Sequence, residues 1–186
     1  MTLLSYSDLK TILTNTASVI RSLQPDYEDF FNLFEKHGFR AVEVIETSRW
    51  SFILPDTYKL VTAKGSNPRY FNKLEFPVSF QTIVESEQDF YFPGLLVVPS
   101  VFGTYVNNDS SYKTIYNIIV KIFETCLTEK LMLASGKTIA THIYRHFYVK
   151  RANIEWGWSI IEIANYIGEV EVQNIENYLI SQIFKE

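Results

Sequence analysis

Apolar residues recur three and four positions apart along most of the chain, a pattern typical of helices that bury one face. Glycines end several of these stretches, because glycine readily adopts the left-handed conformation that commonly follows a helix. The helices predicted in this way cover residues 6–15, 26–36, about 40–47, a stretch after Pro77, and residues 110–132, 136–152, 158–167 and 172–184.

Two short segments have the composition of strands instead. Residues 50–54 and 58–63 are rich in aromatic and β-branched side chains, and the turn-forming Pro55 and Asp56 separate them. The segment KGSNPRYF then predicts a tight turn followed by a third short strand. The sequence therefore predicts a mainly α domain of the α+β class, a helical bundle with one small three-stranded antiparallel sheet.

Composition indicates the class of protein. The 186 residues are 47% hydrophobic and 20% charged, as in an ordinary globular domain, and we expect residues 1–186 to form a single domain. No apolar run reaches the roughly 20 residues that cross a bilayer, and the N-terminus lacks the pattern of a signal peptide. Cys126 is the only cysteine, which excludes an internal disulfide and suits a reducing compartment. We therefore expect a cytoplasmic protein without a membrane partner.

The net charge of −4 argues against a protein that coats nucleic acid non-specifically, because such domains are usually basic. A localised basic face is still compatible with this charge, since the cations gather in two segments. These cations are Lys64, Arg69 and Lys73 in the first half and Lys137, Arg145, Lys150 and Arg151 in the second.

The segment THIYRHF concentrates unusual chemistry, because it holds two of the three histidines together with an arginine. On a helix, His142, Arg145 and His146 would project from one face. They could form a solvated polar face, a zinc site, or an anion site in which arginine clamps a phosphate and histidine moves a proton. The zinc site would be short of ligands, because only His37 and Cys126 remain to complete it.

Two further segments carry candidate residues. Arg40 and Glu43 lie three positions apart after Gly38, so an ion pair could fix the guanidinium, although an ordinary surface pair would have the same spacing. Tyr178 lies beside an apolar helical stripe near the C-terminus and could equally be a packing residue. Neither segment alone indicates a function.

Four segments in succession resemble the sequence boxes of the tyrosine recombinases, the phage-integrase-type enzymes of site-specific recombination. HGFRAVEV is similar to their first arginine box, and YKLVTAKGSNPRYF to the β-hairpin that presents a lysine. THIYRHF resembles their second box, and SIIEIANYIGEVEVQNIENYL resembles the glycine turn that precedes the nucleophilic tyrosine. Each match alone is weak, whereas the four in this order cover almost the whole chain.

The resemblance implies a role for each matching residue. Arg40 and Arg145 would hold the non-bridging oxygens of the scissile phosphate. Tyr178 would attack the phosphorus to leave a 3′-phosphotyrosyl bond, Lys64 would protonate the departing 5′-oxygen, and His142 would assist proton transfer at the tyrosine. The implied protein is a site-specific DNA recombinase that binds double-stranded DNA and self-associates on it as a dimer or tetramer. A viral or mobile-element origin is compatible with this function.

Elementary chemistry fits these residue types without the resemblance. A phenol with a pKa of about 10 needs nearby positive charge and a base to attack at neutral pH. Two guanidinium groups stay charged at any relevant pH and neutralise the phosphate, so no metal or other cofactor is required. The covalent intermediate conserves the energy of the phosphate ester, so strands can be exchanged without ATP.

Two features depart from the family pattern. Glu169 stands where the family has histidine or sometimes tryptophan, and an ionised glutamate would repel the phosphate unless it is protonated, turned aside or paired with a cation. We therefore expect a site that is slow, or that becomes competent only when DNA or a partner rearranges this turn. The chain also has no room for the N-terminal core-binding domain of most relatives, and we expect weak DNA binding for that reason.

Other functions and arrangements stay open. The chain could be a catalytically weak or inactive DNA-binding or regulatory protein of the same fold, or a type IB topoisomerase that acts as a monomer. It could also be an unrelated helical interaction protein, with Arg40, His142, Arg145 and Tyr178 more than about 15 Å apart. The last residues, LISQIFKE, could pack into a neighbouring protomer or onto their own core.

Overall fold

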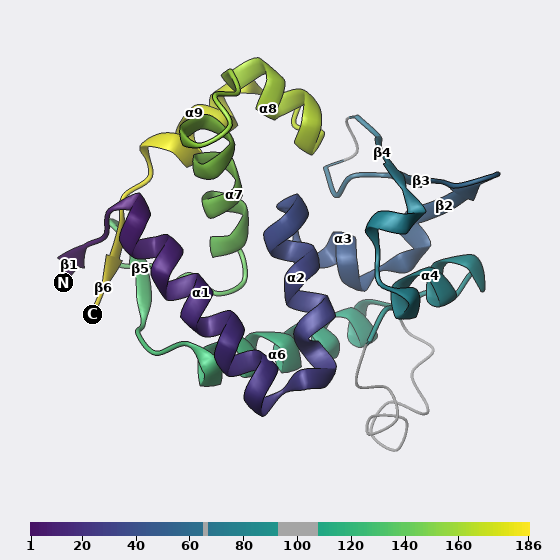
Figure 1. The fold of residues 1–186 in the computed structure, drawn as a ribbon, viewed down its shortest axis with the longest axis horizontal. Helices are drawn as coiled ribbons and strands as arrows, with labels where there is room; N and C mark the ends of the chain where they lie inside the picture. Colours follow the sequence, from purple (N-terminus) through teal and green to yellow (C-terminus); the bar gives the residue numbers. More distant parts are fainter. Residues whose placement is uncertain (65–66, 93–107) are drawn as a thin grey trace.

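The computed structural model describes residues 1–64, 67–92 and 108–186, which form a mainly helical domain with two small sheets (Figure 1). The helices are α1 (Tyr6–Leu23), α2 (Glu28–His37), α3 (Ala41–Ile45), α4 (Val78–Glu85), α6 (Asn108–Cys126), α7 (Ile143–Ile154), α8 (Ile160–Ile167) and α9 (Val172–Ile180). The strands are β1 (Thr2–Leu3), β2 (Trp50–Ile53), β3 (Thr57–Leu60), β4 (Arg69–Asn72), β5 (Leu131–Leu133) and β6 (Ile183–Lys185). None of the helices in these ranges is long and apolar enough to cross a membrane.

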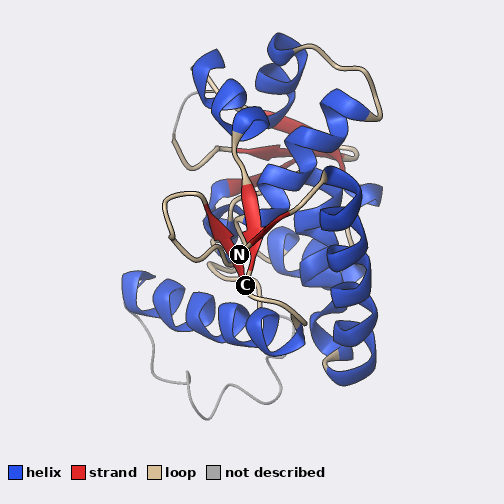
Figure 2. Ribbon diagram, turned by 90° about the vertical axis from the view of Figure 1, so that its left-hand side faces the viewer, coloured by secondary structure: helices blue, strands red, loops and turns tan. Residues whose placement is uncertain are grey.

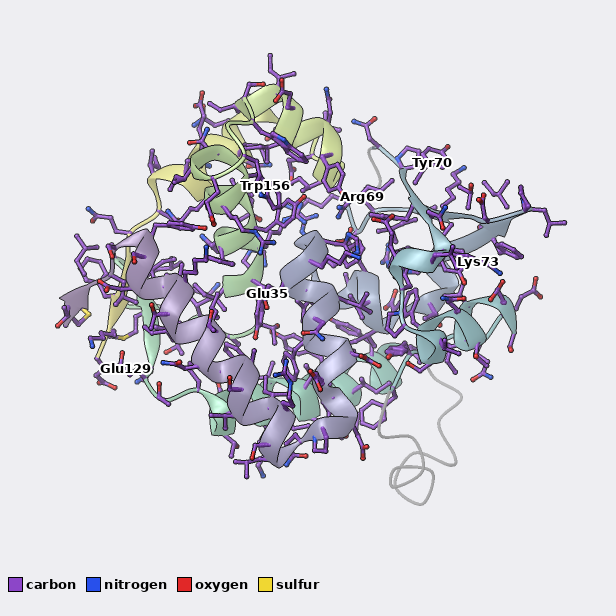
Figure 3. The ribbon with its side chains drawn as sticks, in the orientation of Figure 1. Glu35, Arg69, Tyr70, Lys73, Glu129 and Trp156 are labelled. Carbon is purple, nitrogen blue, oxygen red and sulfur yellow. The ribbon has the colours of Figure 1, made fainter. Side chains whose placement is uncertain are left out.

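Strands β2, β3 and β4 form the antiparallel sheet that the sequence predicts, in the order β2-β3-β4. Side chains alternate between its faces, so that in β4 Arg69 and Phe71 are buried while Tyr70 and Asn72 are exposed. Figure 3 shows Arg69 turned toward the centre of the molecule and Tyr70 turned away from it. The β3–β4 turn, which carries Lys64, lies at one end of this sheet.

A second antiparallel sheet, in the order β1-β6-β5, was not predicted from the sequence. The C-terminal strand pairs with the N-terminal strand on one side and with β5 on the other, so the two termini lie close together (Figure 2). The end of the chain therefore docks on its own domain. The predicted final helix over 172–184 is too long, because α9 ends at Ile180 and β6 follows.

The two helices predicted around β5 also have different bounds. The helix predicted over 110–132 ends at Cys126, and the one predicted over 136–152 begins only at Ile143. The intervening chain folds back on itself instead, since the Ile139 amide donates to the Leu131 carbonyl at 3.0 Å and Thr138 bridges Met132. These pairings satisfy backbone groups that a longer helix would have satisfied internally.

Helix α7 is the central element of the fold. Its first half packs into the main core, where Ile143, Tyr144 and Phe147 meet α1, α2 and α6. Its second half, through Val149 and Ala152, belongs to a smaller apolar cluster with α8 and α9. Because α7 is enclosed on two sides, the polar side chains that it carries are held on a rigid support.

His37 lies in an aromatic cluster at the end of α2. Its ring stacks on Phe76 with centroids 5.3 Å apart and meets Phe39 and Phe71 at 5.1 Å. The residue is 1% exposed, and neither ring nitrogen has a hydrogen-bond partner among the described residues. Burial, together with the charges of Arg69 and Lys36, lowers its pKa to about 3, so His37 is neutral in the folded protein.

This burial predicts a loss of stability in acid. The unfolded chain binds a proton at His37 near its ordinary pKa of about 6.5, while the folded chain does not, so the free energy of unfolding falls as the pH drops below that value. By pH 5 His37 alone should cost about 2 kcal/mol, and His37→Phe should remove that part of the pH dependence. Urea unfolding of the wild type and of His37→Phe at pH 8 and pH 5 measures this change in the free energy of unfolding. An equal change in the two proteins would contradict the prediction.

Candidate active site

Arg145 extends from α7 into the interior and is completely buried. Its Nη1 donates to the carbonyl oxygen of Gly38 at 2.8 Å, and its Nη2 lies 3.5 Å from Oε2 of Glu169. Gly38 ends α2 with φ +66°, and a Cβ atom there would lie 2.7 Å from the Tyr148 ring. The left-handed glycine thus lets the chain turn closely against α7, present its carbonyl to Arg145 and continue to Arg40.

Glu169 pairs with both arginines of the predicted site. Its Oε2 accepts a hydrogen bond from Arg40 Nη2 at 2.8 Å and lies 3.5 Å from Arg145 Nη2, while its Oε1 accepts from Asn174 Nδ2 at 2.9 Å. Burial alone would raise the pKa of Glu169, but the hydrogen bonds from Asn174 and Arg40 and the charges of both arginines outweigh it and lower the pKa. Of the three states expected from the sequence, Glu169 therefore adopts the one paired with cations.

Glu43 does not hold the guanidinium of Arg40, and the ion pair predicted from their spacing is wrong. Its Oε1 accepts from the Arg40 backbone N–H at 2.7 Å, because Arg40 is the N-cap of α3 and Glu43 its third residue. Its Oε2 accepts from the Ala63 N–H at 3.2 Å, and Oε1 lies 4.0 Å from Arg145 Nη1. The fully buried Glu43 thus joins α3, the chain next to Lys64, and α7.

Tyr178 lies on α9 with its hydroxyl 3.2 Å from Nε2 of His142. The ring of His146 meets the Tyr178 ring edge-on at 4.8 Å, and the guanidinium carbon of Arg145 lies 5.8 Å from the centroid of the Tyr178 ring. Together with the shared contact at Glu169, these distances join Arg40, Arg145, His142 and Tyr178 in one cluster. Residues from accidental sequence matches would not be expected to meet in this way.

His142 is the N-cap of α7 and is exposed to solvent. Desolvation lowers its pKa to about 4, and the positive charges of Arg145, Arg40, Lys137 and Lys64 act in the same direction. At neutral pH the ring is uncharged, so one nitrogen can accept a hydrogen bond. Nε2 can therefore accept a hydrogen bond from the Tyr178 hydroxyl, 3.2 Å away.

The two lysines near His142 lie on different turns. Lys64 is exposed on the β3–β4 turn, and Lys137 is exposed on the turn after β5. Both are near enough for their charges to lower the pKa of His142. The sequence singled out Lys64 alone, so Lys137 is a second candidate for any role that needs a mobile ammonium group at this site.

The C-terminal end of α9 is held by residues that the sequence did not assign to the site. Lys150 Nζ donates to the carbonyls of Leu179 at 3.1 Å and Ser181 at 2.9 Å. Its positive charge at the C-terminal end of α9 also interacts favourably with the helix dipole. Ser181 Oγ donates to the Tyr178 carbonyl at 2.7 Å, so it must accept from Nδ1 of His146, 2.9 Å away. The sequence does contain one indication of this role: His146 and Lys150 lie four residues apart, so they project from the same face of α7.

Arg69 is not part of a basic surface, although the sequence grouped it with Lys64 and Lys73. It is 3% exposed and donates to the His37 carbonyl at 3.0 Å. Its guanidinium carbon lies 4.8 to 5.1 Å from the centroids of the Phe39, Phe71 and Tyr166 rings. Burial, opposed by the charge of Glu43, lowers its pKa to about 10. Such an aromatic environment gives Arg69 a packing role beneath the site.

Among the described residues, no group of three or more His, Cys, Asp or Glu could hold a metal ion. His142 and His146 direct ring nitrogens to Tyr178 and Ser181.

No protein-family model and no curated protein matches the sequence. The structure is similar to the crystal structure of XerA recombinase, with a TM-score of 0.53 and 15% identity over 97% of this chain and 60% of that one. It is also similar to XerH site-specific recombinase bound to its palindromic difH substrate in a post-cleavage complex, with a TM-score of 0.51 and 11% identity over 95% of this chain and 49% of that one. The fold is that of a tyrosine recombinase catalytic domain. The chain spans 60% of the first solved protein and 49% of the second.

Within this recombinase fold, Gly168 brings the two halves of the site together. It ends α8 with φ +75°, and a Cβ atom there would lie 2.6 Å from Cγ2 of Thr62 and 2.8 Å from the carbonyl oxygen of Asn67. The glycine thus allows the turn that carries Glu169 to pack directly against the β3–β4 turn that carries Lys64.

This close approach predicts that Gly168→Ala destabilises the recombinase fold more than an equivalent change elsewhere. Gly157 has φ +67°, and a Cβ atom added there would meet no atom within 4 Å, so it is the matched control for backbone strain alone. Gly157→Ala should cost about 1–2 kcal/mol, and Gly168→Ala about 1–3 kcal/mol more because of the clash. Equal unfolding free energies for the two variants would show that the turns are not tightly packed.

Proposed function

We propose that this chain is a site-specific DNA strand transferase that cleaves and rejoins DNA through a 3′-phosphotyrosyl bond to Tyr178. The single observation that carries the proposal is the position of the Tyr178 hydroxyl, 3.2 Å from Nε2 of His142, in the same cluster as Arg40 and Arg145, whose guanidinium groups share Oε2 of Glu169. A tyrosine that served only packing would not need a neutral histidine acceptor and the guanidinium group of Arg145 close to it.

In the proposed reaction, Arg40 and Arg145 bind the non-bridging oxygens of one phosphodiester and stabilise the charge that develops on them. The Tyr178 oxygen attacks the phosphorus while its proton passes to His142, and the bond to the 5′-oxygen breaks. Lys64 gives that oxygen a proton as it leaves. A 5′-hydroxyl from another strand then reverses these steps and releases Tyr178.

Double-stranded DNA is the proposed partner, supported by the DNA substrate in the complex of the similar XerH structure. Residues 1–186 would act as one catalytic domain, and the chains would self-associate as a dimer or tetramer on DNA. The exposed Lys64 and Lys137 near His142 give the mouth of the site positive charge in a chain whose net charge is −4.

A non-catalytic DNA-binding or regulatory protein of the same fold is the second candidate. It is favoured by the carboxylate of Glu169, which occupies the donors of Arg40 and Arg145 that a phosphate would need. Such a protein would bind the same DNA without attaching to it.

Covalent attachment tests the first proposal. A binding sequence is first selected from a random DNA pool, and a duplex nicked near the cleavage point is then prepared, so that the cleaved end diffuses away and the adduct accumulates. The wild type should form an adduct that resists denaturing electrophoresis, and Tyr178→Phe should form none because it lacks the nucleophile. Tyr70→Phe, at a tyrosine 59% exposed on β4, is the matched control. DNA binding without an adduct in the wild type would favour the non-catalytic protein.

The role of Lys64 can be separated from that of its neighbour Lys137. Lys64→Ala should slow adduct formation about 100-fold or more by removing the general acid. The defect should disappear on DNA with sulfur in place of the bridging 5′-oxygen, because a thiolate leaves without a proton. Lys137→Ala should change the rate little on either substrate. If Lys137→Ala shows the sulfur-rescued defect instead, the general acid is Lys137.

A further inference from the structure

The pocket proposed for the phosphate is already filled by a side chain of this protein. The side chain of Arg145 is 0% exposed and that of Arg40 is 14% exposed, and the Glu169 side chain that pairs with both is 5% exposed. No anion from solvent can reach the Arg145 guanidinium while Glu169 keeps this position.

Glu169 also uses the hydrogen-bond donors that a phosphate would require. One oxygen, Oε2, lies 2.8 Å from Arg40 Nη2 and 3.5 Å from Arg145 Nη2, so it stands where a non-bridging phosphate oxygen would be clamped. Nη1 of Arg145 is committed to the Gly38 carbonyl. A carboxylate and a phosphodiester each carry one negative charge, so one can replace the other without leaving the arginines unpaired.

The second oxygen of Glu169 connects the pocket to the helix that carries the tyrosine. Oε1 accepts from Asn174 Nδ2 at 2.9 Å, and Asn174 lies one turn before Tyr178 on α9. The other end of α9 is fixed independently by Lys150. When Glu169 leaves the pocket, the first half of α9 loses a contact while its far end stays in place.

We propose that Glu169 is an internal substitute for the substrate phosphate, displaced when a phosphate enters, and that Asn174 is a positioning residue that transmits this displacement to α9. The inference rests on the proposed function in one respect, namely that the pocket of Arg40 and Arg145 receives a phosphate. The low pKa of Glu169 agrees with it, because the ionised carboxylate is the form that imitates an anion.

Binding of inorganic phosphate to the full chain, measured by isothermal titration calorimetry, tests the displacement. Glu169→Gln should lower the Kd for phosphate about tenfold or more, because the competing charge-assisted hydrogen bonds become weaker. Glu171→Gln removes the same charge from an exposed residue two positions away and should leave the Kd unchanged. The same Kd in wild type and Glu169→Gln would overturn the proposal.

Thermal unfolding distinguishes displacement from a purely structural ion pair. Glu169→Gln should lower the Tm in buffer without phosphate, since the buried Arg145 and the half-buried Arg40 lose the carboxylate that they share, and saturating phosphate should raise its Tm more than that of the wild type. A structural pair would give the lower Tm without the larger response to phosphate. If Glu169→Gln does not fold, Asn174→Ala replaces it, and the looser Glu169 should then allow phosphate to bind about threefold more tightly.

Hydrogen exchange tests the connection to the tyrosine. Saturating phosphate should speed amide exchange in α9 of the wild type, because the contact of Asn174 with Glu169 is lost, and should not change it in Asn174→Ala, where that contact is already missing. Slower or unchanged exchange in wild-type α9 would overturn the role of Asn174.

The two proposals can fail separately. If Glu169→Gln binds phosphate more tightly but the wild type never attaches to DNA, the displacement is supported and the proposed function is overturned. If wild-type Tyr178 attaches to DNA but Glu169→Gln binds phosphate no more tightly than the wild type, the proposed function is supported and the displacement is overturned.

Discussion

The structure depends on one shared contact, in which Oε2 of Glu169 lies between the guanidinium groups of Arg40 and Arg145. Arg40 precedes Glu169 by 129 residues and Arg145 precedes it by 24, so the contact joins the start of α3, helix α7 and the turn after α8. A fully buried guanidinium needs an anion nearby, because charge without a partner is costly inside a protein. Glu169, together with Glu43 at 4.0 Å from Arg145 Nη1, meets this requirement and holds the two halves of the site in contact.

Helix α7 makes the arrangement rigid enough to serve chemistry. It contributes apolar side chains to both cores, and its remaining positions carry Arg145, His146 and Lys150. Arg145 contacts Glu169, His146 contacts the ring of Tyr178, and Lys150 holds the C-terminal end of α9. One buried element therefore fixes the positions of both the Arg145 guanidinium and the Tyr178 ring.

The sequence predicted α2 and the β2-β3-β4 sheet well, but the helix predicted over 6–15 is too short, because α1 continues to Leu23. It missed the second sheet because β1 has two residues and β5 and β6 have three each, too few for a strand pattern to appear. The resemblance of four segments to the recombinase boxes singled out Arg40, His142, Arg145 and Tyr178, which residue types alone had left open, and the structure brings these four side chains into one cluster. The partner of Glu43, the identity of the cations that pair with Glu169 and the burial of Arg69 were not predictable in this way, because each depends on how segments distant in sequence approach one another.

Strand β6 limits how far Tyr178 can move. It is the middle strand of its sheet and begins at Ile183, so only Ser181 and Gln182 separate it from the end of α9. Two extended residues reach about 7 Å at most. A larger displacement of the C-terminal end of α9 would therefore have to separate β6 from both β1 and β5, whereas a rotation of α9 about Ser181 and Gln182 would leave the sheet intact.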